Sequence, residues 1–181
     1  MDHYIDVKVL PDPEFDAATL MNALYAKLHR TLVATNEEKI GVSFPNAKKT
    51  PGNIMRLHAE QATLQQLMEK HWLKGLGDYT HVDEIKPVPA PVEYVQVKRI
   101  QLKMTAARLR RAVKRGSMSV DQAEALLAER KLLKKPFFQF QSSSTNQRFP
   151  LFIEYGKPQK QPTSGRFNSY GLSDIATVPW F

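Results

Sequence analysis

The order of the hydrophobic patterns in the first 86 residues restricts the fold of this chain more than any other feature. Polar and apolar residues alternate over strand length in HYIDVKVL (3–10), and leucines then recur every four residues from Leu20 to Leu32, as in a helix packed on a sheet. Strand patterns follow at 39–44 and 54–59, a helix pattern at 60–72, and an extended segment at 77–88. This order of strand, helix, strand, strand, helix and strand predicts a ferredoxin-like fold, which RNA-recognition domains share and which hosts many functions.

A proline-rich stretch follows this pattern and predicts a domain boundary. Pro87, Pro89 and Pro91 lie close together, so residues 87–93 are expected to be a linker between domains at 1–86 and 94–181. The second domain is expected to contain a strand (92–103), a basic helix (105–116), a second helix (119–135) and a strand pair (137–142 and 147–155). The apolar C-terminal segment, residues 169–181, is expected to pack back onto the fold. The predicted class is α+β, with a ferredoxin-like (RRM-like) first domain and a divergent α+β second domain.

The net charge of +8 is distributed unevenly along the chain. Residues 1–93 contain 13 acidic and 10 basic residues, whereas residues 94–181 contain 5 acidic and 16 basic residues. This asymmetry favours a polyanionic partner for the second half, with nucleic acid as the first candidate and an anionic membrane surface as the second. The chain has no cysteine, no apolar run of membrane-span length and no leader pattern, which excludes thiol chemistry and disulfides and fits a cytoplasmic protein.

The basic helix at 105–116 has an arrangement that suits phosphate contact. At about 100° per residue, a narrow apolar stripe lies opposite the cations. The stripe consists of Ala106, Leu109 and Val113, and the cations are Arg108, Arg110, Arg111, Lys114 and Arg115. A solvated amphipathic helix is the alternative, but such helices normally mix charge signs, and this one has no acid to relieve the repulsion. Its arginines suit two-point contacts to phosphate or guanine.

Residues with catalytic potential are few. None of the five histidines has the spacing of a helical metal site, and no carboxylate cluster occurs, so metal-free chemistry is expected. His29 lies at the edge of the leucine stripe, where a packing role is the alternative to catalysis. The hydroxyl run Ser142 to Thr145 fits either a turn or contacts to ribose and phosphate. Phe149 fits a core position or base stacking, and Tyr170, after the turn-rich PTSGRFNS, is expected near a loop and exposed.

Taken together, the motifs resemble those of one known family. They occur in order from the start of the chain to its end: MDHYIDVKVLPDPEF, KLHRTL around His29, IGVSFP, RIQLK, the basic helix, QSSST, RFPLFI, YGLS and a final VPWF. This set resembles the CRISPR-associated endoribonucleases of subtype I-F (the Csy type), which cut precursor CRISPR RNA within its repeats. The resemblance implies metal-independent cleavage 3′ of the repeat hairpin stem, without a cofactor. It also implies a bound product, the crRNA, and assembly with the other subunits of the type I-F surveillance complex.

The resemblance also assigns roles to individual residues. The family's catalytic residues match His29, Ser142 and Tyr170, with the histidine as the base that takes the 2′-hydroxyl proton, leaving a 2′,3′-cyclic phosphate. Two matching residues, Arg99 and Gln101, would contact bases of the lower stem. Further RNA contacts are implied for Phe149 on the terminal base pair and for Ser144, Thr145, Arg108, Arg111, Lys114 and Arg115.

The basic helix departs from the family at two positions. Ala112 and Gly116 stand where the family can have arginine, so the phosphates that the helix contacts are not fixed by the resemblance. Two other functions remain open on sequence grounds: a non-catalytic RNA-binding scaffold with the same fold, and a DNA-binding or ribosome-associated basic protein. The combination of His29, Ser142 and Tyr170 favours the enzyme, because a protein that only binds RNA does not need all three.

Overall fold

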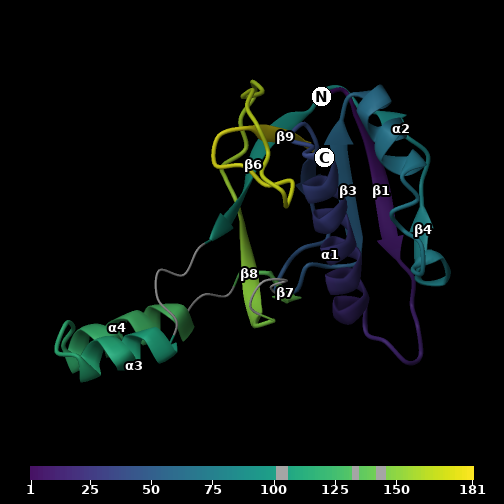
Figure 1. The fold of residues 1–181 in the computed structure, drawn as a ribbon. Helices are drawn as coiled ribbons and strands as arrows, with labels where there is room; N and C mark the ends of the chain where they lie inside the picture. The colour runs from purple at the N-terminus through teal and green to yellow at the C-terminus, as the bar shows by residue number, and fades with distance from the viewer. Residues whose placement is uncertain (101–105, 132–134, 142–145) are drawn as a thin grey trace.

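The structure, a computed structural model, describes residues 1–100, 106–131, 135–141 and 146–181. Its first part has the predicted order of elements (Figure 1). These elements are β1 (His3–Val9), α1 (Ala17–Thr35), β2 (Gly41–Ser43), β3 (Ile54–Ala59), α2 (Gln61–Glu69), a short 3₁₀ turn (Gly77–Tyr79), β4 (Thr80–Val82) and β5 (Lys86–Pro87). The order of these strands and helices along the chain is therefore confirmed, although α2 is shorter than the predicted helix at 60–72.

The first five strands form one antiparallel sheet. The order across it is β2-β3-β1-β4, and the short β5 also pairs with β1. Pro87, at the start of the predicted linker, lies opposite His3 in this pairing. The segment from there to residue 91 is mostly exposed, and the next strand begins at Glu93.

Helix α1 covers one face of this sheet because its ends are capped and one side is apolar. The Asp16 side chain accepts a hydrogen bond from the Thr19 amide at 2.6 Å, and Asn36 ends the helix in the left-handed conformation with φ 50°. The buried face contains Leu20, Met21, Leu24, Tyr25, Leu28 and Leu32. The predicted leucine stripe is therefore confirmed as the core-facing side of α1.

The second antiparallel sheet has the order β7-β8-β6-β9. Its strands are β6 (Glu93–Ile100), β7 (Phe137–Gln141), β8 (Arg148–Tyr155) and β9 (Thr177–Trp180). Strand β9 pairs with β6 and confirms that the C-terminal segment packs back. The buried apolar side chains of both sheets form one cluster, which includes Leu28, Val42, Phe138 and Val178. The two sheets therefore share a core.

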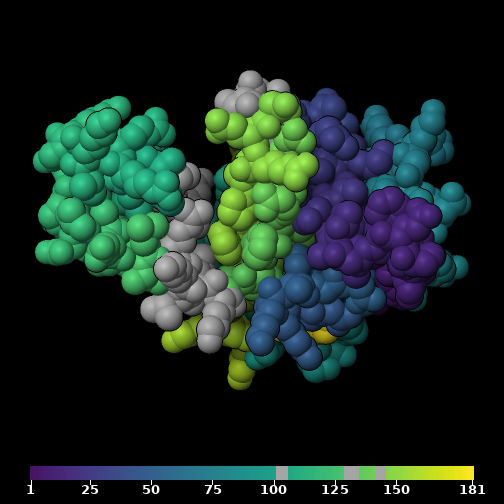
Figure 2. Space-filling view, turned by 90° about the horizontal axis from the view of Figure 1, so that it is seen from below, coloured from purple at the N-terminus to yellow at the C-terminus, as the bar shows by residue number. Residues whose placement is uncertain are grey.

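Helices α3 (Ala106–Lys114) and α4 (Val120–Lys131) form a pair that stands apart from the sheets (Figures 1 and 2). Leu109 of α3 and Ala123 of α4 are buried, yet neither belongs to the shared core cluster. Ser119 and Gln122 form a capping box at the start of α4, with hydrogen bonds of 3.1 Å in both directions. The pair therefore has a local apolar contact and presents its remaining surface to solvent.

Candidate active site

His29 lies on α1 where the helix meets the loop that precedes β9. Its ring is half-buried, and Nδ1 lies 2.8 Å from the carbonyl oxygen of Ser169. A carbonyl oxygen only accepts hydrogen bonds, so Nδ1 has the proton and Nε2 of the neutral ring is an acceptor, for which the described residues provide no donor. Burial lowers the pKa of His29, the positive charges of Arg30 and Arg99 lower it further, and the hydrogen bond to Ser169 opposes them. His29 is therefore set up as a neutral base at physiological pH.

The ring of Tyr170 stacks on the ring of His29. The two rings are parallel within 3°, with centroids 4.0 Å apart, and Phe140 contacts Tyr170 edge to face at 5.2 Å. The buried Tyr25 hydroxyl donates a hydrogen bond of 2.7 Å to the backbone oxygen of Tyr170. Burial raises the pKa of the Tyr170 phenol, so it is neutral at physiological pH. Tyr170 is half-buried, so the expectation of an exposed side chain was wrong, because the stack on His29 covers one face of the ring.

Gly171 allows the loop to place Tyr170 at this position. The backbone of Gly171 has φ +69°, and a Cβ atom there would lie 2.3 Å from Cγ2 of Val42. The carbonyl oxygen of Gly171 accepts a hydrogen bond from the Val42 amide at 2.8 Å, which attaches the loop to β2. Asn168 closes the turn by accepting from the Tyr170 amide at 2.9 Å. Both the conformation and the close approach require glycine.

Arg99 extends from β6 into a space between two aromatic rings. Its guanidinium carbon lies 5.4 Å from the ring centroid of Tyr170 and 5.6 Å from that of Phe149. The Nε atom is buried, and among the described residues it has no hydrogen-bond partner. A buried donor without a partner is costly, so this cation is placed for a ligand that accepts hydrogen bonds.

His29, Phe149 and Tyr170 border a cavity of about 570 Å³. It is lined by Ala26, His29, Arg30, Val33, Ala34, Phe140, Gln141, Asn146, Phe149 and Tyr170. No carboxylate is among these lining residues, so the cavity has a positive to neutral lining. Such a lining suits an anionic ligand with flat apolar groups.

The structure brings four of the predicted site residues together: His29, Arg99, Phe149 and Tyr170. The predicted cations of the basic helix, Arg108, Arg111, Lys114 and Arg115, are exposed on or next to α3, opposite the buried Leu109. The predicted residues Gln101, Ser142, Ser144 and Thr145 lie outside the described residues.

Sequence analysis missed three contributors to this site. Phe140 contacts His29, Phe149 and Tyr170, Tyr25 supports the Tyr170 backbone, and the Ser169 carbonyl orients His29. Alternation in FFQFQ predicts that Phe140 faces the core but not which residues it meets. The role of a backbone carbonyl leaves no signal in a sequence.

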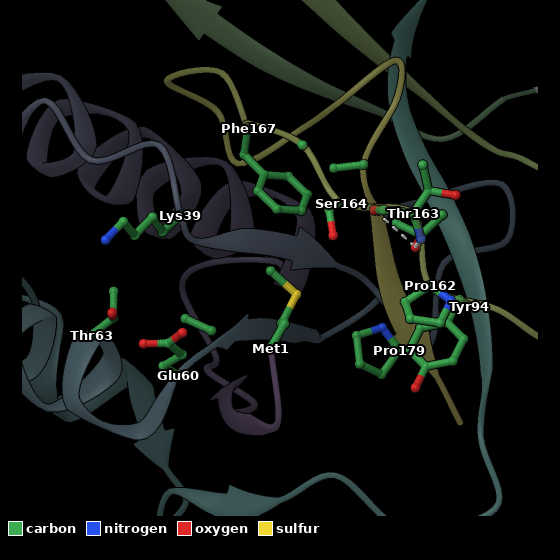
Figure 3. Close-up of a pocket in the computed structure, with 14 residues that line it drawn as sticks. Met1, Lys39, Glu60, Thr63, Tyr94, Pro162, Thr163, Ser164, Phe167 and Pro179 are labelled. Carbon is green, nitrogen blue, oxygen red and sulfur yellow. Dashed lines mark hydrogen bonds between the residues drawn. The ribbon is translucent and has the colours of Figure 1, made fainter.

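A second pocket, of about 300 Å³, lies where the two sheets meet and contains none of the predicted site residues (Figure 3). The residues that line it include Phe167, Tyr94, Pro179, Lys39, Glu60 and Met1. Within the described parts of the chain, no group of three or more His, Asp or Glu side chains could hold a metal ion. No helix in those parts is long and apolar enough to cross a membrane.

The site thus belongs to a protein that combines a neutral histidine with a basic, aromatic-lined surface. Comparison with known proteins identifies its family. The profile described as CRISPR-associated protein (Cas_Csy4) matches residues 4–181. The chain belongs to this family of CRISPR-associated proteins, and the resemblance found in the sequence motifs is confirmed.

Two relatives match along their whole length. A "CRISPR-associated endonuclease Cas6/Csy4" of Escherichia coli (strain UTI89 / UPEC) is 46% identical over 184 residues, covering 100% of both chains. A protein of the same name from Pseudomonas aeruginosa (strain UCBPP-PA14) is 41% identical over 187 residues, again covering 100% of both. A solved structure, "Structure A of CRISPR endoribonuclease Cse3 bound to 19 nt RNA", gives a TM-score of 0.40 at 13% identity. It covers 97% of this chain and 100% of its own.

Proposed function

We propose that this protein is an endoribonuclease that binds the hairpin of the CRISPR repeat and cuts the RNA 3′ of the stem. The observation that carries the proposal is the state of His29, a neutral base whose Nε2 is an acceptor, in a cavity with no carboxylate among its described lining residues. Both full-length relatives are named endonucleases, which supports the same reaction class. We further propose that the enzyme keeps the product crRNA bound in the cytoplasm as a subunit of the type I-F surveillance complex.

The proposed reaction uses the RNA's own 2′-hydroxyl as the nucleophile. Nε2 of His29 takes the 2′-hydroxyl proton, the 2′-oxygen forms a bond to the adjacent phosphorus, and the bond from phosphorus to the 5′-oxygen breaks. Solvent gives a proton to the leaving 5′-oxygen and takes up the proton that His29 accepted, so the products are a 2′,3′-cyclic phosphate and a 5′-hydroxyl. Tyr170 holds the imidazole by stacking. Ser142 would orient the ribose, a role that the family resemblance implies. No metal or cofactor takes part in this scheme.

Binding is proposed to use three sets of residues. Arg99 and Gln101 contact bases of the lower stem, and the unpaired Nε of Arg99 gains a partner there. Phe149 stacks on the terminal base pair, where the stem ends. The cations Arg108, Arg111, Lys114 and Arg115, with the hydroxyls of Ser144 and Thr145, contact phosphates and riboses. The separation of the α3–α4 pair from the sheets gives these cations access to a groove or strand of the hairpin (Figure 2).

The same proposal includes the domain description. Residues 1–86 form a ferredoxin-like domain, residues 87–93 connect it to the second part, and residues 94–181 form the RNA-binding part with the basic helix. The β2-β3-β1-β4 order of the first sheet supports the ferredoxin-like assignment. The shared core cluster means that these parts do not move independently.

Cleavage of a CRISPR-repeat hairpin in EDTA tests the reaction, beside a copy of the RNA with 2′-deoxyribose at the scissile nucleotide. We expect cutting of the ribose substrate only, and we expect His29→Ala to abolish cutting while binding stays nearly unchanged. Cutting of the deoxy substrate would exclude the 2′-hydroxyl mechanism. Tight binding without any cutting by the native protein would favour the alternative, a non-catalytic scaffold.

A further inference from the structure

The exposed side of α1 connects the His29 cavity to a second basic surface. A shallow cavity of about 310 Å³ lies beside the first, lined by Lys27, Arg30, Thr31, Ala34, Thr35, Lys70 and Trp72. Arg30 and Ala34 line both cavities, so the two adjoin on either side of these residues. At about 100° per residue, Arg30 lies opposite the buried leucine face and therefore at the crest of this surface.

This surface carries positive charge, and the nearest carboxylates, Glu37 and Glu69, line a separate pocket on another side of Lys70. No Asp or Glu is among the residues that line either cavity. Arg30 and Lys70 are exposed, whereas Lys27 donates a hydrogen bond to the backbone oxygen of Lys74 and so holds the segment after α2 against α1. Two exposed cations that line one cavity, with no carboxylate in its lining, suit the phosphates of a nucleic-acid strand.

The surface lies on a different side of His29 from the residues assigned to the stem. Arg99 and Phe149 belong to the second sheet, whereas Arg30 and Lys70 belong to α1 and the end of α2. The positive charges of Arg30 and Arg99 both act on the His29 ring, and Arg30 lines the same cavity as His29. An RNA whose scissile phosphate is at His29 must continue beyond it, and the stem already occupies the side of Arg99.

We propose that Arg30 and Lys70 bind the phosphates of the single-stranded RNA that continues 3′ of the scissile phosphate. The strand would cross the crest of α1 from the His29 cavity to the cavity beside Trp72. This inference rests on the proposed function, because it needs a scissile phosphate at His29. It assigns a role to two cations that the hairpin itself does not require.

The test compares two uncleavable hairpins with 2′-deoxyribose at the scissile nucleotide: one that ends there, and one with six further uridines. Two phosphates bound by cations on a single strand give a salt slope of about −1.4, which is about tenfold in affinity at 0.15 M salt. We expect the extension to tighten binding by this factor in the native protein. The double variant R30Q/K70Q should lose the gain and bind the short hairpin normally.

Two controls isolate the surface. K48Q/K49Q removes the same charge from an exposed loop between β2 and β3 and should keep the tenfold gain. An extension with uncharged methylphosphonate linkages should give no gain to any form of the protein. The proposal is overturned if the extension gives no gain in the native protein, if R30Q/K70Q keeps the gain, or if R30Q/K70Q weakens binding of both hairpins equally.

Cleavage of the ribose hairpin by the native protein separates this proposal from the proposed function. If the native protein cuts the RNA but the extension does not affect affinity, only the assignment of Arg30 and Lys70 fails. If the native protein neither binds nor cuts the hairpin, the proposed function fails and this inference fails with it. Circular dichroism of R30Q/K70Q should match the native spectrum, since both side chains are exposed.

Discussion

Replacing Tyr170 separates the contribution of its ring from that of its hydroxyl. The ring lies parallel to His29 at 4.0 Å and covers one imidazole face, while the phenol is neutral at physiological pH because burial raises its pKa. If the ring acts by holding the imidazole, Tyr170→Phe should keep the cleavage rate within about twofold, whereas Tyr170→Ala should not. The structure therefore predicts that the two variants differ.

The size of the loss follows from the stacking contact. A packed aromatic pair contributes about 0.5–1.5 kcal/mol beyond the area it buries, and 1.36 kcal/mol corresponds to tenfold in rate. Tyr170→Ala should therefore slow the chemical step by about 2- to 12-fold at high pH, where His29 is neutral in every form. Below neutral pH the loss should grow. Removing the ring admits water, so the lowered pKa of His29 should rise toward its ordinary value of about 6.5 and more of the base is protonated.

The assay is single-turnover cleavage of a repeat hairpin at pH 5 to 8.5, with enzyme in excess so that product release does not contribute. The rate of the native enzyme should rise with pH and become constant above the lowered pKa of His29. The Tyr170→Ala curve should be shifted to higher pH, and the Tyr170→Phe curve should coincide with that of the native enzyme. An equal loss in both variants would refute the stacking role, because it would mean that the hydroxyl takes part directly.

Three other perturbations test the fold and the binding surface. Gly171→Ala should destabilise the protein by about 1–3 kcal/mol in chemical denaturation and slow cleavage, because the left-handed backbone and the contact with β2 exclude a Cβ. Asp6→Ala should cost about 3–5 kcal/mol of unfolding free energy by leaving Arg56 without its two-point partner, whereas replacing both residues with apolar ones should recover most of this loss. R111Q/K114Q should lower the salt slope of hairpin binding by about one for each cation removed, and an unchanged slope would exclude α3 from phosphate contact.

The fold of the first part could be predicted because each element satisfies a local rule. The leucine stripe of α1 has helical spacing, Asp16 and Asn36 occupy its two caps, and the apolar residues at every second position of β1 and β3 are buried. The ends of the helices could not be predicted as well as their order. Helix α2 ends at Glu69, whereas the predicted helix continued to residue 72. His71, with φ 49°, has a left-handed conformation that the amphipathic pattern does not indicate. The prediction that the C-terminal segment packs back rested only on its apolar residues. Its pairing with β6 is a long-range contact that no local pattern specifies.

The sequence predicted which residues belong to the candidate site, but only part of the contacts that surround them. His29 was predicted at the edge of the leucine stripe, and its ring is half-buried in the structure. The stack with Tyr170, the Arg99 position between two rings and the role of Phe140 depend on strands that are distant in sequence. Periodicity assigns a side chain to a face but does not choose its neighbours on that face. The family resemblance supplied the choice of His29, Tyr170, Arg99 and Phe149 that the residues alone left open.

The state of His29 is determined by contacts that its own helix does not provide. The Ser169 carbonyl that fixes its tautomer lies 140 residues further along the chain. Burial lowers the pKa of His29, and Tyr170 in the same loop stacks on one face of its ring. That loop is fixed at Gly171 to β2 and is followed by β9, which pairs with β6. Any change that loosens this return of the chain should therefore raise the pKa of His29 and slow cleavage near neutral pH without altering a residue that contacts RNA. Stability of the C-terminal segment and activity of the base are coupled because the same contacts produce both.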